Sequence, residues 1–317
     1  MAEIGTDLLK AKTILEEGGL VAIPTETVYG LAANAMNTDA VLNIFEAKKR
    51  PFFDPLILHS DSIEKIKTFV EYIPLDLKLL LRTFSPGPLT VLLPKNKKIS
   101  DLTTAGLPRV GVRIPAHELT LKLLSMLDFP LAAPSANPFG YVSPTTAQHV
   151  QDQLGDRIDY ILDGGPCEIG VESTIVGYEK EQLTVYRKGG LEIETIQEMI
   201  SDVYVRDFSD SNPAAPGMLK SHYSPKKQIL EWKDELHEYP LNKTGILAYC
   251  EIKPTIPKEN QFLLSQKKDL KEAARNLFKG LRFLDNLAID TIYVEMVPEQ
   301  GLGVAINDRL KRALAKN

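Results

Sequence analysis

The stretch FEAKKRPFFDPLILH, residues 45–59, contains the change from helix to strand that sets the fold class. Residues 39–48 have apolar side chains at helical spacing, and Pro51 prevents the helix from continuing. The segment PLILH then predicts a buried strand. Lys48 and Arg50 therefore belong to the end of a helix that leads directly into a sheet.

Helices and strands alternate through the first two hundred residues, a pattern typical of a sheet covered by helices. Strands are predicted at LVAIP (20–24), PLILH (55–59), LTVLLP (89–94), VGVRIP (110–115), PLAAP (130–134), DYILDGG (159–165), STIVGY (173–178) and LTVYR (183–187). Helices are predicted at residues 6–17, 39–48, 75–84, 118–127 and 145–154. Because several strands near 160–187 follow one another without helices, we expect a partly antiparallel or mixed sheet within an α/β domain at residues 1–206.

The pattern lapses in DFSDSNPAAPGMLKSHYSPKK, residues 207–227, whose prolines, glycine and serines predict an interdomain linker. Residues 228–317 predict a small Rossmann-like α/β domain, with strands in TGILAYC and TIYVEMVP and helices at 269–287 and through AINDRLKRAL. This domain has no G-x-G-x-x-G motif, so its shape carries no prediction of nucleotide binding.

The 317 residues are 44% hydrophobic and 25% charged, which is ordinary for a globular protein. A formal charge of −5 and a pI near 5.7 argue against a surface that binds nucleic acid throughout. Cys167 and Cys250 form no C-x-x-C motif and predict neither a disulfide framework nor a zinc site. The polar N-terminus and the lack of a long apolar stretch predict a soluble, unprocessed, cytoplasmic protein that does not bind membranes.

The cations in the opening stretch have two interpretations. In the last turn of a helix they complement the helix dipole and face water. Alternatively, Pro51 and Pro55 stiffen the backbone that follows, so that Lys48 and Arg50 are held rigidly against phosphate groups.

A second polar loop, APSANPFGYVSPTTAQ (133–148), follows a predicted buried strand. Ser135 and Asn137 suit a phosphate or a metal-bound water at a strand end, although a plain turn is the other interpretation. Ser143 is expected to cap the next helix, with Pro144 at its first position.

A third polar loop lies in IPTETVYGLAANA (23–35), where the residues after the first strand predict a pocket lining. Ser173, Arg113 and Arg187 occur within or at the ends of apolar strands, where an unpaired charge is costly. Each arginine therefore has either an ion-pair partner or a ligand. A P-loop is excluded, because the dipeptide Gly-Lys does not occur.

Together these motifs resemble the YrdC/Sua5 family of threonylcarbamoyl-AMP synthases. The resemblance rests on PTETVYGL, KKRP and DPLILH, VGVRIP, APSAN, ESTIV and RKGG in the first domain, and PGMLKSHYSPK matches the longer Sua5 form. It implies a YrdC-like twisted mixed sheet and a nucleotidyltransferase that makes L-threonylcarbamoyladenylate and pyrophosphate from L-threonine, bicarbonate and ATP. Mg²⁺ would accompany ATP, and a tRNA-modifying threonylcarbamoyl transferase would use the product for t6A37 modification.

The resemblance also implies roles for individual residues. A catalytic quartet that holds the ATP phosphates falls on Lys48, Arg50, Ser135 and Asn137. Further nucleotide contacts fall on Ser143, Arg187, His222 and Tyr223, and the threonine pocket falls on Thr27, His59, Arg113, Ala133 and Ser173. Asp54 stands where the family usually has asparagine beside ATP, and it would either repel phosphate or help to hold magnesium. No direct side-chain ligation of a metal is expected.

Other functions and roles stay open at this point. A non-catalytic RNA-binding module, or weak RNA binding by an enzyme, is suggested by the K-K-R run, but the acidic pI argues against a dedicated RNA binder. The related hydrogenase maturation factor carries paired C-x-x-C motifs that this sequence lacks. Residues 216–223 are expected to fold across the mouth of the first domain, or else to hold the two domains together.

Overall fold

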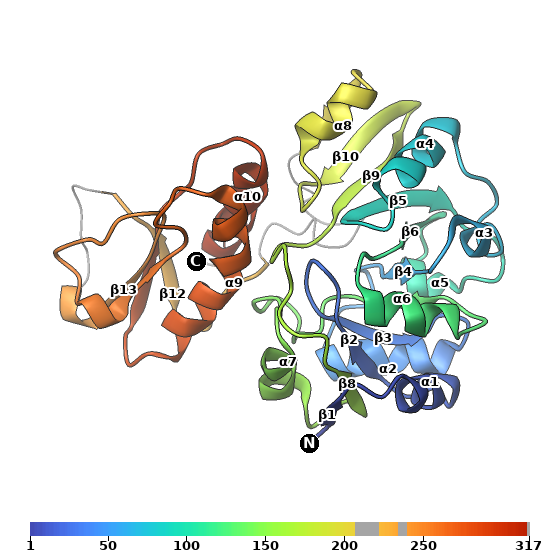
Figure 1. The fold of residues 1–317 in the computed structure, drawn as a ribbon, viewed down its shortest axis with the longest axis horizontal. Coiled ribbons are helices and arrows are strands. Elements are labelled where there is room, and N and C mark those ends of the chain that lie inside the picture. Colours follow the sequence, from blue (N-terminus) through green and yellow to red (C-terminus); the bar gives the residue numbers. More distant parts are fainter. Residues whose placement is uncertain (207–221, 234–239, 316–317) are drawn as a thin grey trace.

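The computed structural model describes residues 1–206, 222–233 and 240–315. Two sheets divide this part of the chain (Figure 1). The larger is 11-stranded in the order β1-β8-β2-β3-β7-β4-β6-β5-β9-β10-β11, and the smaller is 4-stranded in the order β12-β15-β13-β14. Most of the predicted linker, residues 207–221, lies outside the described residues, so its boundaries remain a prediction.

Strands and helices alternate in the first domain as the sequence predicts. The strands are β1 (Glu3–Gly5), β2 (Val21–Ile23), β3 (Gly30–Asn34), β4 (Ile57–His59), β5 (Leu89–Pro94), β6 (Arg109–Arg113), β7 (Leu131–Ala132), β8 (Tyr160–Leu162), β9 (Thr174–Glu179), β10 (Gln182–Arg187) and β11 (Val203–Val205). The helices are α1 (Leu8–Glu16), α2 (Thr38–Lys48), α3 (Ile63–Ile66), α4 (Leu75–Phe84), α5 (Asp101–Thr104), α6 (Glu118–Ser125), α7 (Ala147–Leu154) and α8 (Ile193–Met199).

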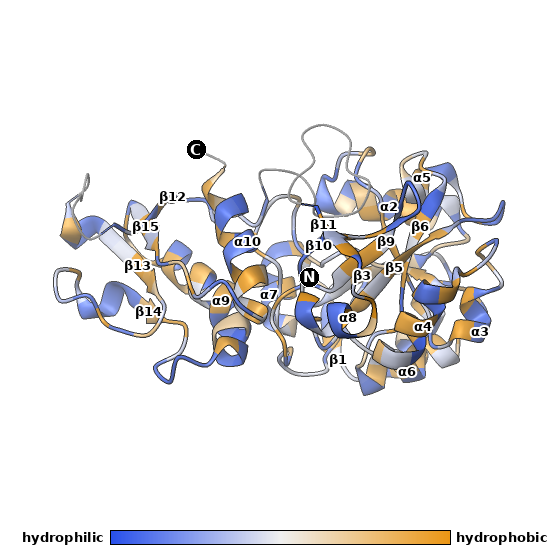
Figure 2. Ribbon diagram, turned by 90° about the horizontal axis from the view of Figure 1, so that it is seen from above, coloured by the Kyte–Doolittle hydropathy of each residue, from blue (hydrophilic) through white to orange (hydrophobic). Residues whose placement is uncertain are grey.

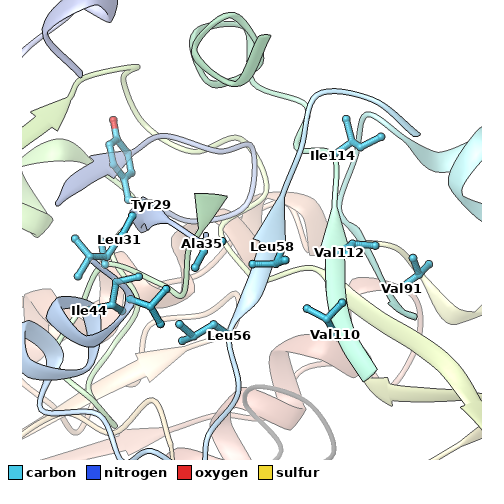
Figure 3. Packing of buried hydrophobic residues seen from close by; sticks show 14 of the residues in the cluster. Tyr29, Leu31, Ala35, Ile44, Leu56, Leu58, Val91, Val110, Val112 and Ile114 are labelled. Carbon is cyan, nitrogen blue, oxygen red and sulfur yellow. The ribbon is translucent and has the colours of Figure 1, made fainter. Parts of the chain in front are cut away.

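Helices cover both faces of the larger sheet. In β2, Val21 and Ile23 pack in one apolar cluster with α1 and α6, whereas Ala22 packs in another with α2. This division follows from the two-residue period of a strand, which sends successive side chains to opposite faces. Figure 3 shows the α2 side, where Ile44 lies near Leu31 of β3 and the buried residues of β4 and β6 pack beside them. Figure 2 shows hydrophobic residues concentrated in the central strands.

The sheet is mixed, which confirms the prediction. β9 and β10 are antiparallel, as are β2 with β3 and β5 with β6, whereas β4 pairs with β6 and β5 pairs with β9 in parallel. β3 was not predicted as a strand, because its sequence GLAAN has no β-branched or aromatic residue.

The C-terminal domain is a parallel α/β unit, as expected. Its elements are β12 (Gln228–Glu231), β13 (Thr244–Ala248), β14 (Gln261–Leu263), α9 (Leu270–Asn286), β15 (Thr291–Val294) and α10 (Leu302–Leu314), with short 3-10 helices at Leu241–Lys243 and Lys258–Asn260. In both views α9 and α10 lie between the small sheet and the first domain (Figures 1 and 2). Val142 and Val171 of the first domain join the apolar cluster of these helices.

The predicted cap of α7 is wrong. The helix begins one turn later, because Thr146 is its N-cap and accepts a hydrogen bond from the backbone N–H of His149. The carbonyls of Pro144 and Thr145 accept hydrogen bonds from Tyr29 and Cys167 instead, so this backbone is held outside the helix. The Ser143 hydroxyl is thereby left for another partner, described below.

Within the described parts of the chain, no helix has the length and apolar character needed to span a membrane.

Candidate functional site

The end of α2 is fixed to the loop that carries the S-x-N motif. Lys48 is only 1% exposed, and its Nζ donates hydrogen bonds to the carbonyl oxygens of Ser135 and Asn137. Burial, with the charge of Arg50, lowers the pKa of Lys48 well below its ordinary value. The helix stops at Lys49, which adopts a left-handed conformation with φ of 53°.

The S-x-N loop also holds itself in shape. The Asn137 side chain donates to the carbonyl oxygens of Pro138 at 2.9 Å and Tyr141 at 2.8 Å. Ser135 forms an isolated bridge with Gly30 of β3. A Cβ at Gly30 would meet the Ala133 side chain at 3.3 Å, so a larger residue would crowd this approach.

Arg50 is buried beside Asp54. Its Nη2 lies 2.9 Å from Oδ2 of Asp54, and its Nε and Nη2 donate to the carbonyl oxygens of Asp54 and Pro55. Asp54 is fully buried and pairs with Arg50. The two roles expected for this carboxylate were repulsion of phosphate and help with magnesium, and pairing with Arg50 is a third role that the sequence did not suggest.

Arg113 stands at the end of β6 against the polar loop after β2. Its Nη2 lies 2.8 Å from Oε1 of Glu26 and donates to the Thr27 hydroxyl at 2.8 Å. Glu26 also accepts from the backbone N–H of Ala116. The ion-pair interpretation therefore holds for Arg113, although the arginine also faces the cavity described below.

Two buried polar groups lie close to Arg113. His59 is 3% exposed, its Nδ1 has no hydrogen-bond partner among the described residues, and burial lowers its pKa to about 3. The imidazole is therefore neutral at physiological pH. The Ser173 hydroxyl lies 2.7 Å from that of Thr90.

Arg187, at the end of β10, binds the same serine. Its Nε and Nη2 donate to the carbonyl and hydroxyl oxygens of Ser173, each at 3.0 Å. Burial lowers the pKa of Arg187 to about 10. Beside it, Glu172 accepts a 2.5 Å hydrogen bond from the Ser143 hydroxyl, which is the partner that replaces the predicted helix cap.

His222 and Tyr223 close the site from the linker side. Tyr223 is 1% exposed and has φ of 64°, which is uncommon for a bulky residue. Its ring stacks on Phe278 of α9 at 5.7 Å. Next to it, the Ser224 backbone N–H donates to Gly140, and its hydroxyl donates to Ala313 of α10. These residues therefore contact both domains.

These side chains surround one cavity of about 50 Å³. Of the residues predicted for the site, Arg50, His59, Arg113, Ala133, Ser135, Ser173, Arg187, His222 and Tyr223 line it. The remaining predicted residues do not line the cavity, but each forms a hydrogen bond or an ion pair with a residue that does: Lys48, Asn137, Asp54, Thr27 and Ser143. Residues 216–221 of the expected cover lie outside the described residues.

The lining also includes residues that the sequence did not single out. Thr25 and Glu172 belong to the quoted motifs PTETVYGL and ESTIV, so their motifs were found although their own roles were not.

Comparison with known families matches nearly the whole chain. The Sua5/YciO/YrdC model, described as "Telomere recombination", matches residues 13–189. A second model, "Threonylcarbamoyl-AMP synthase, C-terminal domain", matches residues 191–315.

Individual proteins agree with these models. The threonylcarbamoyl-AMP synthase of Pyrococcus abyssi is 39% identical over 325 residues, covering 96% of this chain and 92% of that protein. That of Bacillus subtilis is 39% identical over 319 residues, with the same two coverages. The crystal structure of P. abyssi Sua5 complexed with L-threonine matches with a TM-score of 0.90 and 37% identity, over 99% of this chain and 97% of that chain.

Proposed function

The chain belongs to the Sua5 family of threonylcarbamoyl-AMP synthases, and we propose that it forms L-threonylcarbamoyladenylate and pyrophosphate from L-threonine, bicarbonate and ATP. It is a transferase of the nucleotidyltransferase type, in tRNA processing. The product would pass to a transferase that modifies tRNA. We assign it to the cytoplasm.

One observation carries this proposal: Arg50, Arg113 and Arg187 converge on a single cavity with the hydroxyls of Ser135 and Ser173. Three cations around one small cavity suit substrates that bear several negative charges. ATP phosphates would meet Arg50 and Ser135, and the threonine carboxylate would meet Arg113.

The chemistry needs no protein nucleophile. The threonine amine attacks bicarbonate, and loss of water leaves a carbamate. The carbamate oxygen then bonds to the α-phosphorus of ATP while the bond to the bridging oxygen breaks and pyrophosphate leaves. The arginines would neutralise the charge on the phosphates, and the loop held by Lys48 would keep Ser135 in position. Because the imidazole of His59 is neutral, Arg113 would supply the positive charge that the threonine carboxylate meets.

Magnesium would enter with the nucleotide. Within the described residues there is no group of three or more histidine, cysteine or acidic side chains that could hold a metal. Each carboxylate near the cavity already faces an arginine: Asp54 pairs with Arg50, Glu26 with Arg113 and Glu172 with Arg309. These residues fit no directly ligated ion, so we derive no step through one.

The burial of His222 and Tyr223 bears on how substrates reach the cavity. Tyr223 is 1% exposed and His222 is 6% exposed, so both side chains are packed over the cavity. His222 and Tyr223 form the wall on the linker side, so we infer that they move aside for substrates and close over them.

The experiment is an assay of pyrophosphate release with each substrate omitted in turn. Release should require L-threonine and bicarbonate together, and other amino acids should not replace threonine. Full-rate release from ATP alone would contradict the proposal. The alternative of a non-catalytic RNA-binding module gains no support from relatives that are named as synthases. Weak RNA binding is tested by filter binding of tRNA at increasing salt. A dedicated RNA binder would still bind tRNA at moderate salt, and its affinity would fall steeply with the logarithm of the salt concentration.

A further inference from the structure

Arg309 of α10 is fully buried although it belongs to the C-terminal domain, and its charge is directed at the first domain. Its Nε lies 2.8 Å from Oε2 of Glu172, a residue that lines the cavity. Its Nη2 donates to the carbonyl oxygen of Lys188 at 2.9 Å, and its guanidinium lies 5.0 Å from the centre of the Tyr223 ring. One side chain of α10 therefore contacts the cavity wall, the RKGG turn and the linker.

The backbone of the RKGG turn lies directly against Glu172 in the cavity wall. A Cβ at Gly189 would lie 2.4 Å from the carbonyl oxygen of Glu172, so only glycine permits the approach. The N–H of Gly190 donates to the same carbonyl oxygen. The backbone of Glu172 is thus fixed by these contacts, and its carboxylate is held by hydrogen bonds from Ser143 and Arg309.

Glu172 carries a negative charge at this wall. Burial alone would raise its pKa, but Arg309 and Arg187 outweigh burial and hold the pKa below its ordinary value. A carboxylate here would repel the phosphates of a nucleotide unless a cation remains paired with it. Arg187 is the other cation beside it, and the hydrogen bonds described above direct Arg187 to Ser173.

We propose that Arg309 is a positioning residue of the active site: it neutralises Glu172 and thereby leaves Arg187 with Ser173, where it can receive the nucleotide. The inference rests on the proposed function. It gives the C-terminal domain a role in catalysis, because that domain supplies a charge that the cavity of the first domain needs.

A purely structural role predicts a different response. If the ion pair only joins the domains, loss of one charge lowers stability and loss of both restores it, while the KM for ATP stays unchanged in both variants. If neutralisation is what matters, removing Arg309 raises the KM for ATP through the unpaired charge of Glu172, and removing both charges restores the KM. Arg309 also pairs through Nη1 with Asp308 at 2.5 Å. When Arg309 is removed, Asp308 still keeps its ion pair with Arg312 at 2.9 Å, so Glu172 is the carboxylate that loses its cation.

The test compares Arg309→Met, Arg309→Met/Glu172→Gln and Arg309→Lys by pyrophosphate release at varied ATP. Arg309→Met should raise the KM for ATP by about 10- to 100-fold with a smaller change in kcat. The double variant and Arg309→Lys should both return the KM to within about threefold of wild type. Since the amide oxygen introduced by Glu172→Gln would still accept from Ser143, the double variant isolates the charge.

The matched control is Arg275→Met on α9. Arg275 also donates across the domains, to the carbonyl oxygen of Glu168 at 2.9 Å, but it lies outside the cavity lining. The Arg275→Met variant should leave the KM for ATP unchanged. If the double variant is as impaired as Arg309→Met, or if Arg309→Met matches Arg275→Met, the inference is overturned. Should Arg309→Met fail to fold, the double variant alone decides by its KM. Wild-type protein without threonine-dependent release would instead refute the proposed function.

Discussion

Nζ of Lys48 lies 2.5 Å from the backbone carbonyl oxygen of Ser135, which ties the last turn of α2 to the loop after β7. A lysine whose Nζ is committed to backbone carbonyls supports the phosphate site through the loop that it holds. Its burial and its second bond, to Asn137, strengthen this connection. Lys48 and Arg50, which the sequence treats as a pair, thus have different surroundings.

The first prediction concerns Lys48→Met. It leaves two buried carbonyl oxygens without their donor, so we expect a loss of about 1–3 kcal/mol in the free energy of unfolding and a raised KM for ATP. Thermal unfolding and kinetics measure the two effects. Lys49→Met is the control, because Lys49 is exposed, and it should change neither. Wild-type behaviour of Lys48→Met would show that the contact is dispensable.

The second prediction concerns Arg50→Ala. Loss of one charge-assisted phosphate contact, worth about 1.5–3 kcal/mol, should lower kcat/KM by roughly 10- to 150-fold. The variant also leaves Asp54 buried without its cation. Adding Asp54→Asn should therefore restore thermal stability but not activity. Recovery of activity in the double variant would mean that Arg50 serves only to pair with Asp54.

The third prediction separates the two substrates. Arg113→Met should raise the KM for threonine by about tenfold or more, with less effect on the KM for ATP, because the arginine is assigned to the amino-acid carboxylate. Arg109→Met is the matched control at the other end of β6, where Arg109 donates to Tyr178 and Tyr186 outside the cavity lining. Equal rises in both KM values for Arg113→Met would contradict the assignment.

The fourth prediction is a pH dependence of stability. The pKa of His59 is about 3 in the folded protein and about 6.5 when unfolded, so the unfolded chain binds the extra proton as the pH falls below 6.5. Stability is therefore full above pH 6.5 and is lost between 6.5 and 3, by about 2 kcal/mol at pH ~5. His59→Gln should lose less stability between pH ~8 and ~5 in urea unfolding. His149 and His222 contribute equally to the wild-type and His59→Gln proteins. An equal loss of stability in the two proteins as the pH falls would therefore refute the assignment of this loss to His59.

The fifth prediction concerns the closing segment. Ser224 N–H donates to Gly140, and His222 N–H donates to Arg312. If His222 and Tyr223 move aside for substrates, hydrogen exchange at both amides should be fast in the free protein and slowed by ATP with threonine. His222→Ala/Tyr223→Ala should reduce this protection and activity together. Unchanged exchange with ligands and full activity of the double variant would leave only a role in joining the domains.

Most of the fold was predictable because its elements carry local signals. The segment from Leu75 to Phe84 was predicted with the bounds that α4 has, since its leucines repeat at helical spacing. The cap of α7 was predicted wrongly because Ser-Pro is a strong local signal, whereas the hydrogen bonds of Pro144 and Thr145 come from distant segments. Local chemistry cannot report such contacts.

The site likewise has residues that the sequence indicated and one that depends on distant contacts. The resemblance to synthases is confirmed, and several of the residues that it suggested in the first domain line the cavity. It gave no indication of Arg309, because an arginine within an amphipathic helix is usually explained as part of the solvent-facing side. Its partner Glu172 is 137 residues away, and only the packing of two domains brings them together.

That separation has a consequence during translation. At elongation rates of about 5–20 residues per second, Arg309 is synthesised about 7–27 s after Glu172. A nascent first domain that folds in this interval does so around a buried carboxylate whose main cation has not yet been made. The residues of the first domain that line the pocket are therefore synthesised before Arg309, the residue that neutralises Glu172.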